Sequence, residues 1–246
     1  MSSITVQFVG SGDAFGSGGR FQSCVLLRGA GDDVMVDCGA SSVVAMKRAG
    51  LDPSQIGCVL LTHLHGDHFG GLPFLILDGQ FSRRTMTLRI AGPPGVRERI
   101  LAAMEVFFPG SSTIVQRFDI EFIELQERAP AVIGSATVTP YAVEHASGAT
   151  ANALRVEYGG KVIACSGDTE WSEGLVDAAR GADLFICEAY FFEKKIKYHL
   201  DYQTLRSQMP RLESKRMILT HMSDDMLGRT ADAEIECAQD GMVVTL

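Results

Sequence analysis

Metal-ligand side chains are concentrated in residues 62–68, which read Thr-His-Leu-His-Gly-Asp-His. This stretch contains three of the six histidines in the chain, follows the apolar run Val-Leu-Leu and precedes a pair of glycines. A loop at the end of a strand can turn several donor atoms toward one point, and we expect Gly66 to supply the tight curvature. Imidazole and carboxylate are ligands of Zn²⁺ and related first-row ions. The stretch therefore predicts a metal site rather than a chance polar cluster at the start of a helix.

Apolar runs bounded by Gly, Asp or Pro predict many short strands, with helices between and after them. The predicted strands are residues 4–9, 24–27, 34–37, 58–62, 88–91, 120–125, 136–143, 153–158, 161–165, 184–187, 216–220 and 242–246. The predicted helices are residues 42–49, 95–107, 170–179 and 201–209. This pattern favours a layered α/β sandwich with helices on the outside. Since no linker, repeat or low-complexity stretch interrupts it, we expect one domain over residues 1–246.

Composition narrows the classes of function. The formal net charge of −8 argues against a general nucleic-acid-binding surface. The sequence has no apolar run long enough for a membrane span and no charged segment leading into an apolar one at its N-terminus, so we expect neither membrane insertion nor a signal peptide. Its six cysteines form no CxxC pair, which favours reduced, buried thiols. We therefore expect a cytoplasmic protein.

Three further ligand-type residues each end an apolar, strand-like run. They are His145 in Tyr-Ala-Val-Glu-His, Asp168 in Cys-Ser-Gly-Asp-Thr and His221 in Ile-Leu-Thr-His-Met. One such residue alone is usually structural, but all three at strand ends can reach a shared edge of the sandwich. Their order after the first motif resembles the metallo-β-lactamase-fold hydrolase superfamily from end to end of the chain. The resemblance implies a four-layer αββα sandwich with the metal site at one edge of the β-sandwich.

The resemblance also implies a ligand set for two divalent metal ions. Zinc is the expected metal, with Mn²⁺ or Fe as alternatives. A hydroxide bridging the two ions would attack the substrate. One ion would be held by His63, His65 and His145, the other by Asp67, His68 and His221, with Asp168 bridging the two.

Within the superfamily, the chain is most similar to the ribonuclease Z and cyclic-phosphate phosphodiesterase branch. Phe-Val-Gly-Ser-Gly at residues 8–12 and Val-Asp-Cys-Gly at residues 36–39 resemble motifs of that branch. Cys-Glu-Ala-Tyr at residues 187–190 resembles its His-Glu-Ala-Thr, and His199 matches a histidine beside the metals, although Leu-Asp replaces the Ser-Thr that usually follows it.

Three residues acquire catalytic roles by this resemblance. Asp67 would orient or deprotonate the attacking water as well as bind metal. His199, fixed by Glu188, would hold a phosphate oxygen or protonate the leaving alkoxide. The alternative for the last pair is a surface histidine and a glutamate that caps a helix.

Comparison with the ribonuclease Z branch suggests the class of substrate. Ribonuclease Z proteins grip tRNA with a flexible arm, usually inserted between the ligands that match His145 and Asp168, but here only the 22 residues 146–167 intervene. We therefore expect a phosphodiesterase for a small phosphodiester, such as a cyclic phosphate, a nucleotide or a short oligonucleotide, and no structured tRNA partner. A ribonuclease Z-type tRNA 3′-end endonuclease, a lactone or thioester hydrolase and a non-hydrolytic metal-binding scaffold are the alternatives. A homodimer is possible, because relatives are often dimers.

Two other groups of residues have competing interpretations. Lys194, Lys195 and Lys197, beside His199, could attract phosphate or form a solvated charged face. Five phenylalanines could line the mouth of a substrate site, but we expect them to pack in the core: Phe69, Phe74, Phe81, Phe107 and Phe108.

Overall fold

Two seven-stranded sheets form the centre of the computed structural model, which describes residues 3–246. The first sheet is antiparallel from β14 to β3 and parallel from β3 to β6. Its strands, in spatial order, are β14 (Val243–Thr245), β1 (Thr5–Gly10), β2 (Cys24–Arg28), β3 (Asp33–Val36), β4 (Ile56–Leu60), β5 (Leu88–Gly92) and β6 (Ile120–Glu124).

The second sheet is parallel from β13 to β10 and antiparallel from β10 to β7. Its strands, in spatial order, are β13 (Glu236–Cys237), β12 (Met217–Thr220), β11 (Leu184–Glu188), β10 (Lys161–Cys165), β9 (Ala151–Tyr158), β8 (Ala136–Val143) and β7 (Ala131–Ile133).

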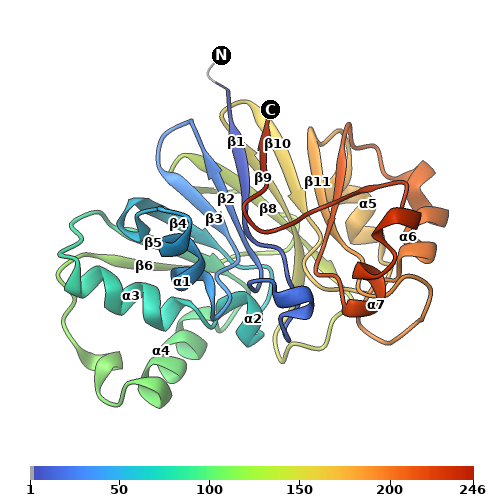
Figure 1. The fold of residues 1–246 in the computed structure, drawn as a ribbon. Coiled ribbons are helices and arrows are strands. Elements are labelled where there is room, and N and C mark those ends of the chain that lie inside the picture. The colour runs from blue at the N-terminus through green and yellow to red at the C-terminus, as the bar shows by residue number, and fades with distance from the viewer. Residues whose placement is uncertain (1–2) are drawn as a thin grey trace.

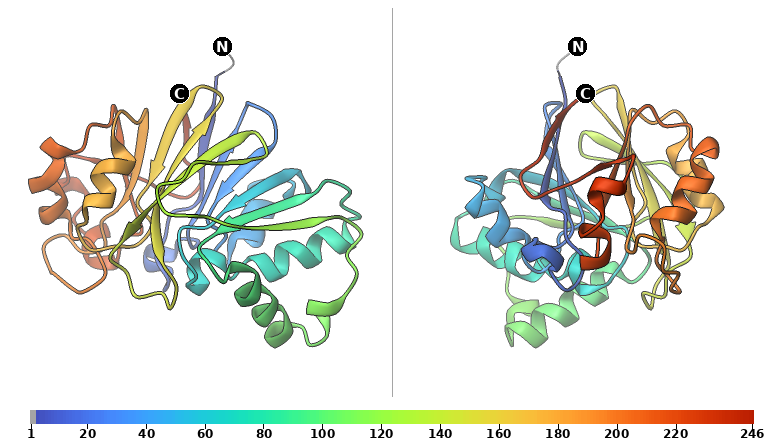
Figure 2. Two further views of the ribbon diagram at one scale, coloured as in Figure 1. Left: turned by 180° about the vertical axis from the view of Figure 1, so that it is seen from behind. Right: turned by 45° about the vertical axis from the view of Figure 1, so that its right-hand side comes forward.

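Helices cover the outer face of each sheet (Figures 1 and 2). The first sheet carries α1 (Ser42–Arg48), α3 (Leu72–Phe81) and α4 (Val96–Phe107), and the second carries α5 (Glu173–Ala179) and α6 (Tyr202–Gln208). Two short helices, α2 (Gly66–Phe69) and α7 (Asp224–Leu227), lie at the end of the sandwich away from both chain termini. The four layers are those of an αββα sandwich, as the sequence predicts. Within residues 3–246, no helix combines the length and apolar character needed to cross a bilayer.

Alternation along the strands divides the core into layers. On β2, Val25 and Leu27 face the other sheet, whereas Cys24 and Leu26 face the helices. Because both faces of the central strands are covered, β4 and β11 are apolar almost throughout, whereas the edge strand β6 carries the exposed Glu121 and Glu124. The fully buried Tyr158 closes one side of the layer between the sheets by donating its hydroxyl to the Asp32 carbonyl.

Helix α3 is the main element that the sequence analysis did not predict. Its residues, Leu-Pro-Phe-Leu-Ile-Leu-Asp-Gly-Gln-Phe, are apolar on most sides and show no helical periodicity. Pro73 lies in the first turn, where a proline removes no helical hydrogen bond. Helix α5 is shorter than expected, since it begins at Glu173 rather than at residue 170.

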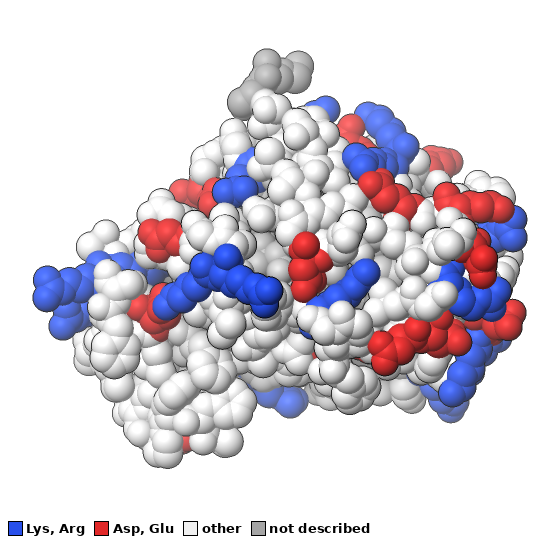
Figure 3. Space-filling model, in the orientation of Figure 1, with Lys and Arg blue, Asp and Glu red and all other residues white. Residues whose placement is uncertain are grey.

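The expected core packing of the phenylalanines is wrong for three of the five. Phe74, Phe81 and Phe107 are 39%, 85% and 49% exposed, whereas Phe69 is buried. The three exposed rings line an open apolar groove between α3 and α4, and Figure 3 shows a mostly uncharged surface over α4 at lower left. Composition gives the apolar character of these helices, but not which of their faces the fold covers.

Candidate metal centre

Six strands bring their carboxyl ends to one edge of the sandwich, next to α2 in Figure 1. From the first sheet, Asp37 follows β3 and His63 follows β4, and His65 leads into α2. From the second sheet come the residues that follow or end its strands: His145 after β8, Asp168 after β10, Glu188 at the end of β11 and His221 after β12. Each half of the molecule therefore contributes side chains to the same site.

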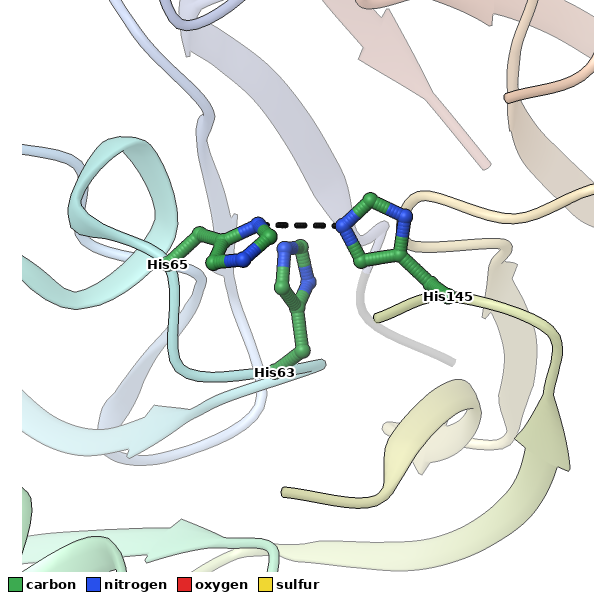
Figure 4. Close-up of side chains that lie close together, drawn as sticks. All are labelled: His63, His65 and His145. Atoms are coloured by element: carbon green, nitrogen blue, oxygen red, sulfur yellow. Dashed lines mark hydrogen bonds between the residues drawn. The ribbon is translucent and has the colours of Figure 1, made fainter. Parts of the chain in front are cut away.

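The first ligand cluster consists of His63, His65 and His145, whose ring nitrogens come within 4.8 Å of one another. Figure 4 shows the three rings pointing toward a common centre. His65 Nδ1 lies 3.0 Å from His145 Nε2, the hydrogen bond drawn there. His63 is fully buried, whereas His65 and His145 line the cavity.

The second cluster consists of Asp67, His68, Asp168 and His221, all buried and with donor atoms within 4.8 Å of one another. The carboxylate of Asp168 lies 3.2 Å from Nε2 of both His68 and His221. It also lies 3.8 Å from His63 and 4.0 Å from His145, both in the first cluster. Asp168 therefore stands between the two clusters, in the position expected of a bridging carboxylate.

The outward nitrogens of the histidines are held by neighbours. Asp37 accepts a hydrogen bond from His68 Nδ1 at 2.7 Å, and the Thr62 hydroxyl lies 3.1 Å from His63 Nδ1. His145 Nδ1 donates to the Tyr198 carbonyl at 2.8 Å. These bonds fix the orientations of the three rings and leave Nε2 of His63, His68 and His145 free to ligate, the arrangement that orients metal-ligating histidines.

Three non-glycine residues around the site have left-handed backbone conformations. Asp37, Tyr198 and His221 have φ angles of 57°, 71° and 56°. Such conformations cost on the order of 1–3 kcal/mol each and concentrate at functional sites. Here the left-handed turn after β3 lets Asp37 reach His68, and the one after β12 turns His221 toward Asp168.

Burial and charge give these groups the protonation states that metal ligands need. Burial lowers the pKa of His63, His145 and His221 below the usual histidine value, which favours the neutral form of these rings. Burial alone would raise the pKa of Asp168, but His221 and His68 hold it well below the usual range. Metal ligation requires neutral imidazoles and ionised carboxylates.

His68 is the exception. Burial alone would lower its pKa, but the carboxylates of Asp168, Asp67 and Asp37 raise it well above the usual value. The three carboxylates thus attract positive charge to the centre of the site. A bound cation would supply that charge in place of the imidazolium proton.

The donor set fits a dinuclear metal site. Among the described residues, His63 Nε2, His68 Nε2 and Asp168 Oδ1 are buried and form no hydrogen bond, although the last two atoms lie 3.2 Å apart. Leaving such atoms unsatisfied costs about 1–3 kcal/mol each. All three atoms face the space between the two clusters, where divalent cations would satisfy them.

Glu188 and His199 form a pair at the side of the site. Glu188 is fully buried, accepts a hydrogen bond from the Thr169 amide and lies 3.0 Å from His199 Nδ1. Burial raises the pKa of Glu188 to about 7. Although burial alone would lower the pKa of His199, Glu188 raises it to about 8. The alternative of a surface histidine and a helix-capping glutamate does not describe this pair, because the carboxylate is buried and holds the imidazole.

The cavity in front of the ligand clusters has a volume of about 220 Å³. It is lined by His65, Asp67, His145, Asp168, His199 and His221, together with Ala14, Phe15 and Tyr190. Tyr190 stacks on the His199 ring, with centroids 4.7 Å apart. All the residues expected to bind metal or act in catalysis therefore lie within or directly behind one small cavity.

Sequence analysis did not assign roles to three residues that support this site. Asp37 belongs to the Val-Asp-Cys-Gly motif. The feature that could have indicated its role is its position, a charged residue directly after a buried strand. Thr62 acts through its side-chain hydroxyl and Tyr198 through its main-chain carbonyl. Neither interaction produces a distinctive pattern in the sequence. The expectation for Gly66 is not met, since its backbone conformation is an ordinary one and a side chain there would meet open space.

Comparisons with known proteins agree with the geometry. A family model described as "Anti-Pycsar protein Apyc1" matches residues 4–243. A ribonuclease Z of Agathobacter rectalis is 28% identical, with 85% of this chain and 84% of the relative covered. The short form of human tRNase Z has a similar structure, with a TM-score of 0.78, 26% identity and 98% of both chains covered. The metallo-β-lactamase fold protein YhfI of Bacillus subtilis has a TM-score of 0.81 at 19% identity over 100% of both chains.

Proposed function

We propose that this chain, which belongs to the family described as Anti-Pycsar protein Apyc1, cleaves a small phosphodiester. The proposal starts from its class, a metal-dependent hydrolase of the phosphodiesterase type. The proposed substrate class comprises cyclic phosphates, nucleotides and short oligonucleotides. The observation that carries the proposal is the Glu188–His199 pair, which places a held imidazole beside two metal-ligand clusters in one cavity. The ribonuclease Z named among the relatives points to the same kind of bond.

We assign one metal to His63, His65 and His145, the other to Asp67, His68 and His221, and the bridging position to Asp168. When bound, two divalent ions lower the pKa of a water and neutralise charge on the phosphoryl oxygens. Imidazole nitrogens with carboxylate oxygens suit Zn²⁺, which we propose as the native metal ahead of Mn²⁺ and Fe.

The protein side chains complete the reaction. Asp67 lines the cavity, where its carboxylate orients the attacking water and accepts a proton from it as the water oxygen bonds to phosphorus. As the new P–O bond forms, the bond to the leaving alkoxide breaks. His199 then donates a proton to that alkoxide from Nε2, because Glu188 already engages Nδ1. Alternatively, the same nitrogen holds a phosphoryl oxygen in the transition state.

Substrate size follows from the cavity and the charge. The cavity volume of about 220 Å³ lies below the range of about 300–1,000 Å³ typical of small-molecule sites, which favours a small substrate. Between His145 and Asp168 the chain forms β9, β10 and their connections, with no arm that could grip a folded RNA. With a net charge of −8, electrostatic attraction for tRNA is weak.

The test is a substrate panel with protein of known metal content. It compares bis(p-nitrophenyl) phosphate with a lactone, a thioester and an intact precursor tRNA. We expect diester hydrolysis that exceeds turnover of the other three, and a loss of about 10²–10⁴-fold in His199→Ala, the usual contribution of a general acid. Activity confined to the lactone or thioester, and unchanged in His199→Ala, would contradict the proposal. Faster cleavage of precursor tRNA would favour the ribonuclease Z-type alternative.

A further inference from the structure

Tyr190 covers one face of the His199 ring at the side of the cavity. The two rings are stacked, with centroids 4.7 Å apart and an angle of 29° between their planes. Stacked aromatic pairs in proteins have centroids about 4.5–7 Å apart, so this is a close contact. The rings of His145 and His221, which are assigned to the metals, lie farther from His199, at 5.1 and 5.8 Å.

The other restraints on His199 leave the plane of its ring free. Glu188 lies 3.0 Å from Nδ1, and a hydrogen bond at one atom fixes the position of that atom but not the plane of the ring. The backbone of His199 lies between β11 and α6, outside any helix or named strand, and forms an isolated bridge with Ile196. The orientation of the imidazole therefore depends on the side chain that covers its face.

Tyr190 is itself held on several sides. Its amide donates to the Leu200 carbonyl at 2.8 Å, and its carbonyl accepts from the Ser223 amide at 3.0 Å. Its ring packs edge-on against Phe191, with centroids 4.8 Å apart, and the Lys194 ammonium lies over the other ring at 4.8 Å. A ring that is fixed through both its backbone and its edge can hold another ring in place.

We propose that Tyr190 is a positioning residue, which holds the plane of the His199 ring so that Nε2 points at the reacting phosphodiester. The inference rests on the proposed function, in which His199 donates a proton or holds a phosphoryl oxygen. A displacement of about 1 Å can cost on the order of 100-fold in rate, so a loosened imidazole would lose much of its effect. The His-Glu-Ala-Thr motif ends in threonine, which has no ring face, whereas this chain has Tyr190.

The experiment is a double-mutant cycle, in which kcat and KM for bis(p-nitrophenyl) phosphate are measured in Tyr190→Leu, His199→Ala and the double variant. We expect Tyr190→Leu to lower kcat by about 10–100-fold with little change in KM, because alignment matters most in the transition state. In the His199→Ala background, the same substitution should have no further effect, since residues that act through one another are not additive. Tyr190→Phe, which keeps the ring, should retain the wild-type kcat.

A second readout does not depend on activity. The ring current of Tyr190 shifts the NMR signals of the carbon-bound ring protons of His199 upfield, and these signals are assigned by their loss in His199→Ala. They should move downfield in Tyr190→Leu and stay in place in Tyr190→Phe. Tyr141→Leu is the matched control, because the Tyr141 ring is also engaged, by Arg128 at 5.4 Å, but lies on β8 away from the cavity lining. It should change neither kcat nor the His199 signals.

Three results would overturn the positioning role and leave the proposed function standing. The first is a wild-type kcat in Tyr190→Leu while His199→Ala is impaired. The second is an equal loss from Tyr190→Leu with and without His199. The third is an equal loss in Tyr190→Phe and Tyr190→Leu, which would assign the effect to the hydroxyl. If the wild-type enzyme does not cleave the diester, or His199→Ala cleaves it at the wild-type rate, the proposed function and this inference fail together.

Discussion

Asp37 shows how a residue that touches no substrate can decide whether the site works. It bonds His68 Nδ1 at 2.7 Å and also accepts from the Thr62 amide and hydroxyl, so one carboxylate orients parts of both ligand clusters. The Thr62 hydroxyl in turn contacts His63 Nδ1 and thereby orients that ring. The backbone at Asp37 is left-handed, which a buried strand end tolerates only when the surroundings hold it.

Asp37→Asn is therefore expected to weaken metal binding by about 10–100-fold, the usual effect of removing such a partner. The measurement is a competition titration of the metal-free protein against a chelator of known affinity. Asp33→Asn is the control, since Asp33 lies at the opposite end of the same strand, β3. Equal metal affinity in both variants would show that Asp37 does not position His68.

At the scale of elements, the sequence predicted the site better than it predicted the helices around it. His145, Asp168 and His221 each follow an apolar strand, and the ends of strands running in one direction meet at one edge, so their convergence could be predicted. Helix α3 was missed because it is apolar on most sides. The exposure of Phe74 and Phe107 depends on how α3 and α4 pack, which is a tertiary property with no local signal.

The close contact between the turn after β3 and helix α2 makes an element-scale prediction. A Cβ on Gly39 would collide with the Asp67 carbonyl oxygen and lie 2.7 Å from the Gln22 Cβ. Gly39→Ala should therefore push α2 away from β3, destabilise the fold by about 1–3 kcal/mol and reduce metal binding. Thermal unfolding and metal content of the purified variant measure both effects.

Gly66→Ala is the matched control, because Gly66 lies in α2 itself and a Cβ there meets open space. Its stability and metal content should match those of the wild type. The two glycines thus separate a position that requires glycine from one where it is dispensable. A wild-type result for Gly39→Ala would mean that the turn and the helix can separate without disturbing the ligands.

At the scale of the whole molecule, the candidate site joins the two halves of the sandwich. His63 and His65 come from the first sheet and its following loop, whereas His145 comes from the second. The second cluster is divided in the same way, with Asp67 and His68 facing Asp168 and His221. Because these residues converge only in the folded state, metal binding must stabilise the fold.

Removal of metal by a chelator should therefore lower the melting temperature. A ligand at 100 times its Kd stabilises the native state by about 2.7 kcal/mol per site, and 1 kcal/mol corresponds to about 2–4 °C for a chain of this size. We expect a fall of at least about 5 °C, reversed by adding Zn²⁺. Equal melting temperatures for metal-free and metal-loaded protein would argue against ligation across the two sheets.

The number of metal ions per chain tests the central claim most directly. Metal-free protein is titrated with Zn²⁺ while bound metal and hydrolysis of bis(p-nitrophenyl) phosphate are followed together. We predict tight binding of two equivalents per chain, with full diester hydrolysis only after the second. In Asp168→Asn, the second equivalent should bind weakly and activity should be lost. Saturation at one equivalent, or full activity at one, would contradict a dinuclear phosphodiesterase.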